Sequence, residues 1–177
     1  MKQVSNLALK AMCIHARGLI DKIYLHWTAG NYNQMFDDYH ININGNGDVY
    51  VSGNDFTVYR EHTWHRNSRA VGISLCCAFG AELGNGGLAT GKYPPTREQI
   101  EAMASIIAIL CTGLHLEINE DTVMTHAEVA KIDGYGVYSG DPLTKWDLYK
   151  LKDIDGMIYN GGDILRGKAQ WYFEQGV

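Results

Sequence analysis

The strongest constraint on the fold is a nearly continuous apolar run in the middle of the chain, from Val71 to Ala78. A run of this length and composition is typical of a central strand that is buried on both faces. Together with the patterns described next, it predicts the α/β class. We expect one domain with a mixed central β-sheet that is flanked by helices.

Four further segments are predicted to be strands. Ile23–Trp27 is short, apolar and rich in residues that favour strands. Tyr39–Ile43 is followed by the turn-rich Asn44–Asp48, and Val49–Val51 then fits as the hairpin partner. Val123–Thr125 is another short strand.

Helical periodicity is clearest after Thr96, which forms a capping box with Gln99 and precedes an apolar stripe that ends at Leu114. Ser5 can cap an earlier helix that Gly18 closes. The patterns at Trp146–Leu151 and Ile164–Phe173 are weaker. The predicted helices therefore cover about residues 5–17, 96–114, 146–151 and 164–173.

Composition limits the domain organisation and the partners. The chain has 177 residues, 46% of them hydrophobic and 20% charged, which fits one globular domain over residues 1–177. The net charge of −5 argues against nucleic acid as the main partner. No apolar run approaches the roughly 18 residues of a membrane span, so we expect no membrane insertion. Met1–Ile20 contains several charged residues and makes a poor signal peptide, which predicts synthesis in the cytoplasm.

The cysteines give no sign of a metal site or a disulfide framework. Cys13, Cys76, Cys77 and Cys111 form no C-x-x-C pair. We interpret them as buried reduced thiols.

Two histidines and one aspartate suggest a metal site. His26 and His126 each end an apolar run that we predict to be a strand, and Asp141 lies in a Gly140-Asp141-Pro142 turn. Two imidazoles and one carboxylate would leave a tetrahedral Zn²⁺ one open position, where water is activated. Spacing alone does not show that the three residues meet. A single-zinc hydrolase is the working hypothesis.

Two other carboxylates compete with Asp141 for the third ligand position. Asp133 lies in a glycine-flanked loop, and Asp147 follows Trp146 on a predicted helix, where it would interact with the helix dipole. Glycine and proline fix a turn around Asp141. We therefore favour Asp141 and expect Asp133 and Asp147 to be dispensable for metal binding.

Five short motifs occur in a specific order along the chain. They are His26-Trp27-Thr28-Ala29, Tyr39–Ile43 before a glycine turn, His65 with Asn67-Ser68 before the 71–75 strand, Thr125-His126, and Asp141-Pro142. This order resembles that of the zinc-dependent N-acetylmuramoyl-L-alanine amidases, which include phage amidase lysozymes and peptidoglycan recognition proteins. The resemblance covers most of the chain, from about Ile23 to about Leu148.

The resemblance implies a surface groove in which His26, His126 and Asp141 hold Zn²⁺. There the zinc-activated water would cleave the amide bond between the muramyl lactoyl group and L-alanine. It also implies that Tyr39 stabilises the oxyanion. Some phage members carry a lysine two residues before the third ligand. Ser139 stands there in this chain, and Lys145 is the nearest replacement.

Further residues are candidates for proton transfer and substrate contact. Glu128, two residues after His126, is a candidate proton acceptor, and Thr28, His65 and Asn67 are candidates for binding substrate. Aromatic side chains can stack on sugars, and the candidates for that role are Trp27, Trp64 and Tyr135.

The sequence-based expectation is a peptidoglycan-degrading endolysin of a phage or prophage, without a separate wall-binding module. It would reach the wall through a holin-type membrane lesion, and peptidoglycan or its muropeptides would be the partner. An injected antibacterial effector fits the same sequence. The alternatives are a non-catalytic module that binds muropeptides and a thiol amidohydrolase that uses Cys76 or Cys77.

Overall fold

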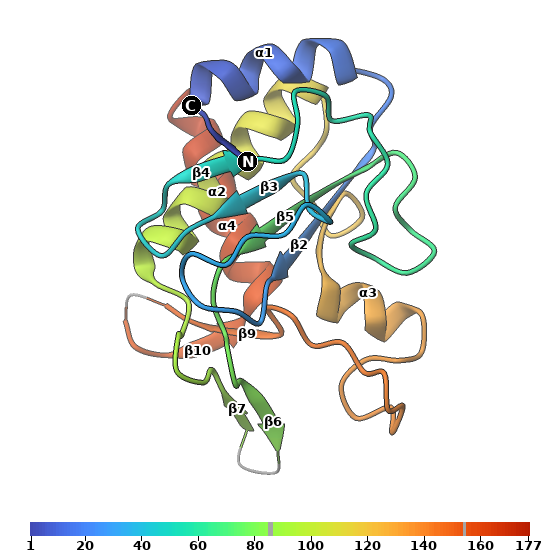
Figure 1. Ribbon diagram of the computed structural model, residues 1–177, viewed down its shortest axis with the longest axis vertical. Coiled ribbons are helices and arrows are strands. Elements are labelled where there is room, and N and C mark those ends of the chain that lie inside the picture. The colour runs from blue at the N-terminus through green and yellow to red at the C-terminus, as the bar shows by residue number, and fades with distance from the viewer. Residues whose placement is uncertain (85–86, 154) are drawn as a thin grey trace.

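The computed structural model describes residues 1–84, 87–153 and 155–177, and its main feature is a mixed sheet (Figure 1). In these residues the sheet has six strands in the order β1-β4-β3-β5-β2-β8. The strands are β1 (Lys2–Gln3), β2 (Lys22–Trp27), β3 (Ile41–Ile43), β4 (Val49–Val51), β5 (Ala70–Leu75) and β8 (Val123–Thr125).

Strands β3, β5, β2 and β8 run parallel to one another. At one edge β4 pairs antiparallel with β3, and β1 pairs antiparallel with β4. Every residue of β5 is buried, as the apolar run predicted. The strand ends at Leu75, and the following residues up to Ala78 remain buried. The mixed α/β sheet predicted from the sequence is confirmed.

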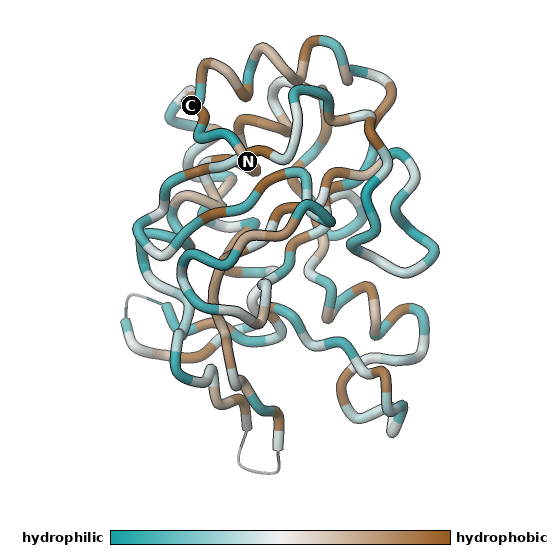
Figure 2. The backbone as a smooth tube through the Cα atoms, viewed as in Figure 1, coloured by the Kyte–Doolittle hydropathy of each residue, from teal (hydrophilic) through white to brown (hydrophobic). Residues whose placement is uncertain are grey.

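The described helices are α1 (Asn6–Ala16), α2 (Arg97–Leu114), α3 (His126–Ile132) and α4 (Gly161–Glu174). Helices α2 and α4 pack against each other behind the sheet, and α1 packs on α2 (Figure 1). Helix α3 follows β8 directly and lies at the carboxyl end of the parallel strands. Hydrophobic residues follow the central strands and the helix faces that cover them (Figure 2).

Predicted helix caps form, and one of them ties α2 to the sheet. The side chain of Ser5 accepts a hydrogen bond from the backbone of Ala8, and Thr96 and Gln99 form the complete capping box. The Gln99 amide also donates to the carbonyls of Ile43 and Cys76 at 3.1 and 3.0 Å. This buried residue therefore satisfies backbone groups where β3 and β5 end.

The helix predicted over Trp146–Leu151 is wrong. Residues 146–149 form turns, and β9 (Lys150–Lys152) then pairs with β10 (Ile158–Asn160). Leu148 has a φ of +58°, which is incompatible with a right-handed helix. A second small hairpin consists of β6 (Glu82–Gly84) and β7 (Gly87–Ala89).

Two local predictions also differ from the structure. Helix α3 was not predicted, because its seven residues are too few to display an apolar stripe. Strand β3 begins at Ile41, so Tyr39 lies in the bend that precedes it rather than on the strand. In the described part of the chain, no helix is long and apolar enough to cross a membrane.

Candidate metal centre

The sheet brings the two predicted histidines together. Strands β2 and β8 are parallel neighbours, and their register pairs Leu25 with Thr125. The next residue on each segment is a histidine, His26 at the end of β2 and His126 at the start of α3. Their Nδ1 atoms are 3.1 Å apart, and both side chains are buried. The carboxyl end of a parallel sheet is where open α/β folds place their functional side chains.

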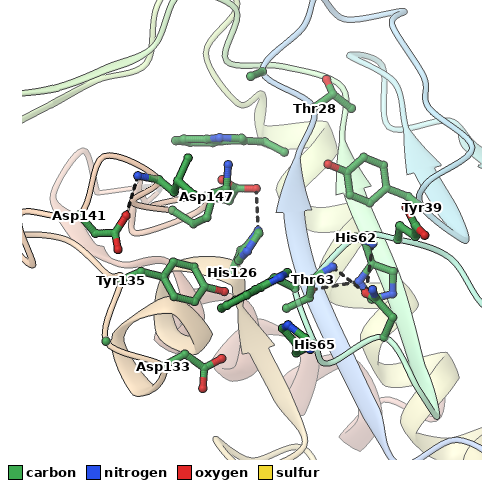
Figure 3. Close-up of a pocket in the computed structure, with 18 of the residues that line it drawn as sticks. Thr28, Tyr39, His62, Thr63, His65, His126, Asp133, Tyr135, Asp141 and Asp147 are labelled. Carbon is green, nitrogen blue, oxygen red and sulfur yellow. Dashed lines mark hydrogen bonds and ion pairs between the residues drawn. The ribbon is translucent and has the colours of Figure 1, made fainter.

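Asp147, not Asp141, completes this cluster. Its Oδ2 atom lies 3.5 Å from Nδ1 of His26 and 3.5 Å from Nδ1 of His126. The three side chains are the only described group of histidines, cysteines or carboxylates that meets the geometry of a metal site. Figure 3 shows Asp147 above His126 in the pocket.

Packing fixes the segment that carries Asp147. Trp146 packs edge-on against Trp27 with a centroid distance of 5.4 Å, and Leu148 is fully buried in the core. The carbonyl of Asp147 accepts a hydrogen bond from the backbone of Ala127, in the first turn of α3. The carboxylate is therefore held between the partly buried Trp146 and the buried Leu148, although its segment is a turn.

The three side chains fit a zinc ion. A tetrahedral Zn²⁺ with bonds of about 2.0–2.2 Å separates its ligand atoms by roughly 3.3–3.5 Å, close to the observed 3.1–3.5 Å. Burial lowers the pKa of His26 to about 4, so its ring is neutral near pH 7. Burial alone would raise the pKa of Asp147, but the hydrogen bonds and charges of His126 and His26 outweigh it and the pKa is lowered. The cluster thus offers two imidazoles and one carboxylate as possible ligands.

The structure places Asp141, our predicted third ligand, away from the histidines. It is exposed at the rim of the groove, and its Oδ1 atom accepts a hydrogen bond from the backbone of Leu143 at 2.7 Å. This is an Asx turn, in which the carboxylate satisfies a local backbone group. Gly140 and Pro142, which led us to favour Asp141 as a ligand, indicate this turn and not a metal ligand.

Glu128 does not line the groove and is not placed to accept a proton there. Its carboxylate accepts hydrogen bonds from the backbone of Thr125 at 2.8 Å, as part of the α3 capping box, and from Arg166 at 3.0 and 2.8 Å. Arg166 comes from α4 and is largely buried. Glu128 therefore stabilises the start of α3 and joins it to α4.

We expect Glu128→Ala to destabilise the fold without affecting the metal site. The free energy of unfolding should fall by about 2 kcal/mol, between the roughly 1 kcal/mol of a lost cap and the 3–5 kcal/mol of a broken buried ion pair, since the Glu128 side chain is 32% exposed. Chemical denaturation would measure this change. Exposed Glu120→Ala is the control, and loss of zinc in folded Glu128→Ala would contradict this assignment.

A groove of about 910 Å³ is lined by two members of the cluster, His126 and Asp147. Its walls include Trp27, Thr28 and His65 from the predicted substrate-binding set. Trp27 is buried against Trp146, whereas His65 and its neighbour Trp64 are exposed. The described lining residues are Trp27, Thr28, Ala29, Tyr39, Tyr59, Glu61, His62, Thr63, Trp64, His65, Asn67, His126, Asp133, Gly134, Tyr135, Asp141, Leu143, Lys145 and Asp147.

Asn67 has a structural task beside the groove. Its Oδ1 atom accepts hydrogen bonds from the backbone amides of His62 and Thr63 at 3.1 and 2.7 Å, and its amide donates to the hydroxyl of Tyr59 at 3.2 Å. The side chain is buried. Asn67 thus shapes the loop that forms one wall of the groove.

Tyr39 and Lys145 both line the groove beside the cluster. The ring centroid of Tyr39 is 5.2 Å from that of His26. Burial raises the pKa of the Tyr39 phenol, so it remains protonated and can donate a hydrogen bond. Lys145 lies two residues before Asp147. That is the spacing at which the family resemblance led us to expect a lysine before the third ligand.

Sequence reasoning missed His62 and Thr63, which lie next to the cluster. The rings of His62 and His26 meet edge to face with centroids 5.3 Å apart, and the Thr63 hydroxyl is 3.3 Å from Nε2 of His26. His62 occurs three residues before His65, but neither residue ends an apolar run. Without such a run, the pattern gave no reason to prefer His62.

The buried thiols do not resemble nucleophiles. Neither Cys76 nor Cys77 is among the described residues that line the groove, and both are buried and free. Burial raises the pKa of Cys76 to about 12. A thiol of this kind is not deprotonated near neutral pH, which argues against a thiol amidohydrolase.

Comparisons with known proteins identify the family of the chain. The profile of the N-acetylmuramoyl-L-alanine amidases (Amidase_2) matches residues 16–140, and the chain belongs to this family. A search of curated proteins gave no match.

Solved structures with a similar chain path include endolysins and peptidoglycan recognition proteins. The endolysin N-acetylmuramoyl-L-alanine amidase LysCS from Clostridium intestinale is 19% identical, with a TM-score of 0.46, and the match covers 63% of this chain and 71% of that one. Drosophila PGRP-SA is 16% identical, with a TM-score of 0.44, and the match covers 62% of this chain and 68% of that one. Wild-type Drosophila PGRP-LB is 19% identical, with a TM-score of 0.45, and the match covers 62% of this chain and 71% of that one.

Proposed function

We propose that this protein is a zinc-dependent peptidoglycan hydrolase that cleaves the amide bond between N-acetylmuramic acid and L-alanine. The observation that carries the proposal is the cluster of His26, His126 and Asp147, in a chain of the amidase family. Two members of the cluster, His126 and Asp147, line the groove. Its two imidazoles and one carboxylate match the ligand sets of catalytic zinc sites, which keep one position open.

Each residue of the site has a task in this reaction. His26, His126 and Asp147 would hold Zn²⁺, which when bound lowers the pKa of a water ligand toward about 7 and polarises a carbonyl. The phenol of Tyr39 donates a hydrogen bond to the oxygen of the scissile amide as negative charge develops there. Lys145 also lines the groove, and its ammonium would add positive charge there.

The shape of the groove suits a branched glycopeptide. Its volume of about 910 Å³ lies near the upper end of ligand pockets, which span roughly 300–1,000 Å³. Trp64 and Tyr135 provide aromatic surfaces at its wall. We propose that these rings contact sugar or stem peptide, and that Thr28 and His65 supply polar contacts.

We favour an enzyme over a muropeptide-binding module because a complete ligand set and a protonated tyrosine lie together in one groove. A binding module needs neither. Within the enzyme hypothesis, we propose the role of a phage or prophage endolysin that reaches the wall through a membrane lesion. An injected antibacterial effector would use the same chemistry.

Digestion of purified peptidoglycan tests this function. The zinc-loaded protein should release stem peptides that carry a free L-alanine amino terminus and should leave the glycan strands intact, as identified by mass spectrometry. A chelator should abolish the release, and added zinc should restore it. New reducing sugar ends would identify a glycosidase instead. Tight muropeptide binding without cleavage would support the recognition module.

A further inference from the structure

A chain of hydrogen bonds runs from the metal cluster into the wall of the groove. The hydroxyl oxygen of Thr63 lies 3.3 Å from Nε2 of His26 and 3.1 Å from Nδ1 of His62. Figure 3 shows Thr63 beside His62. All three side chains are buried. A buried hydroxyl between two imidazoles can serve as acceptor to one ring and donor to the other.

The direction of these hydrogen bonds follows from the metal cluster. Nδ1 of His26 faces Nδ1 of His126 and the carboxylate of Asp147, so it must carry a lone pair to bind a cation. The proton of the neutral ring is then on Nε2, which donates to the Thr63 hydroxyl. That hydroxyl is left to donate its own proton to Nδ1 of His62.

The opposite direction would prevent metal binding. If Thr63 donated to Nε2 of His26, the ring proton would be on Nδ1 and would point at His126. As an acceptor, the hydroxyl of Thr63 stabilises the His26 tautomer whose Nδ1 atom is free to bind a metal. His126 has no equivalent partner, since its Nε2 atom is buried and makes no hydrogen bond within the described residues.

The position of Thr63 is itself fixed. Its backbone amide donates to Asn67 at 2.7 Å, and that side chain also holds the amide of His62. The ring of His62 packs over Gly72 of β5, where an added Cβ would lie 2.6 Å from the ring. The loop therefore holds the hydroxyl in place against the sheet.

We propose that Thr63 is a positioning residue that fixes the His26 tautomer required for metal binding. The inference rests on the proposed function, because it assumes that the cluster of His26, His126 and Asp147 binds zinc. Partners of this kind orient the ligands of metal sites, and losing one typically costs 10–100-fold in metal affinity.

Zinc affinity of Thr63 variants, measured by competition with a chromogenic chelator, tests the proposal. Thr63→Val keeps the shape but removes the hydroxyl, and it should bind zinc about 10–100-fold more weakly. Thr63→Ser keeps the hydroxyl and should stay within about threefold of the wild type, since it keeps the hydrogen bond. The control Thr112→Val changes an exposed threonine on α2 and should have no effect.

Nitrogen-15 NMR of the zinc-loaded protein adds a readout that does not depend on turnover. The Nε2 proton of His26 should move upfield in Thr63→Val, because it loses its acceptor. If Thr63→Val does not fold, Thr63→Ala and Thr63→Ser give the same comparison, since both lack the methyl group and only the serine has the hydroxyl. Alanine should then bind zinc at least about tenfold more weakly than serine.

The outcomes separate this inference from the proposed function. Wild-type zinc affinity in Thr63→Val, or equal affinity of the alanine and serine variants, would overturn the role of Thr63. A wild-type protein that binds no zinc would refute the metal centre itself. A wild-type protein that binds zinc but cleaves no peptidoglycan would refute the amidase activity and leave the effect of Thr63 on affinity measurable.

Discussion

Asp147→Ala should lose most zinc affinity and nearly all amidase turnover. The substitution removes the only carboxylate in the described structure that contacts both His26 and His126. It leaves a site with two neutral ligands and no negative charge. We expect the loss of affinity to exceed the 10–100-fold that is typical of residues that only orient a ligand. Metal analysis after dialysis and peptidoglycan digestion would measure the two effects.

Asp141→Ala and Asp133→Ala are the matched controls. Asp141 is held in an exposed turn, and Asp133 is paired with Arg66 at 2.7 Å on the rim of the groove. Both variants remove a carboxylate from the same groove, and both should keep one equivalent of zinc. If Asp141→Ala lost the metal while Asp147→Ala kept it, the third ligand would be Asp141 as the sequence suggested.

The sequence predicted the parts of the fold that depend on periodicity. The apolar run that overlaps β5 and the apolar stripe of α2 can be recognised in the sequence. Burial on both faces of a strand or on one face of a helix leaves a regular pattern. The same patterns placed His26 and His126 at strand ends. Their contact follows from the parallel register of β2 and β8, which a sequence does not state.

The third member of the cluster, Asp147, was not predicted because turns are specified by packing as much as by local residues. Glycine and proline around Asp141 correctly indicate a turn, but they do not say which way it faces. Asp147 is positioned by Trp146 against Trp27 and by the burial of Leu148, contacts between segments distant in sequence. The positive φ of Leu148 is incompatible with the predicted helix. The sequence gives no sign of it, because positive φ values are usually found at glycine and this residue is a leucine.

The second large effect expected concerns Tyr39, whose phenol is the donor placed beside the cluster. Tyr39→Phe should lower kcat by roughly 10²–10³, the range for losing one donor to a developing oxyanion. Zinc content should not change, because Tyr39 touches the His26 ring without being a ligand of the cluster. Steady-state kinetics on a soluble muropeptide would separate kcat from KM. Tyr138→Phe, an exposed tyrosine outside the described groove lining, is the control.

Lys145→Ala should lower kcat less than Tyr39→Phe does. Lys145 is exposed at the groove, so water screens its charge, whereas Tyr39 is partly buried and its hydrogen bond forms in a less polar setting. A double variant would show whether the two groups act on the same oxygen, because their effects would then not add. If Tyr39→Phe kept full kcat, the phenol would not contact the transition state. Oxyanion stabilisation would then have to come from the metal and Lys145 alone.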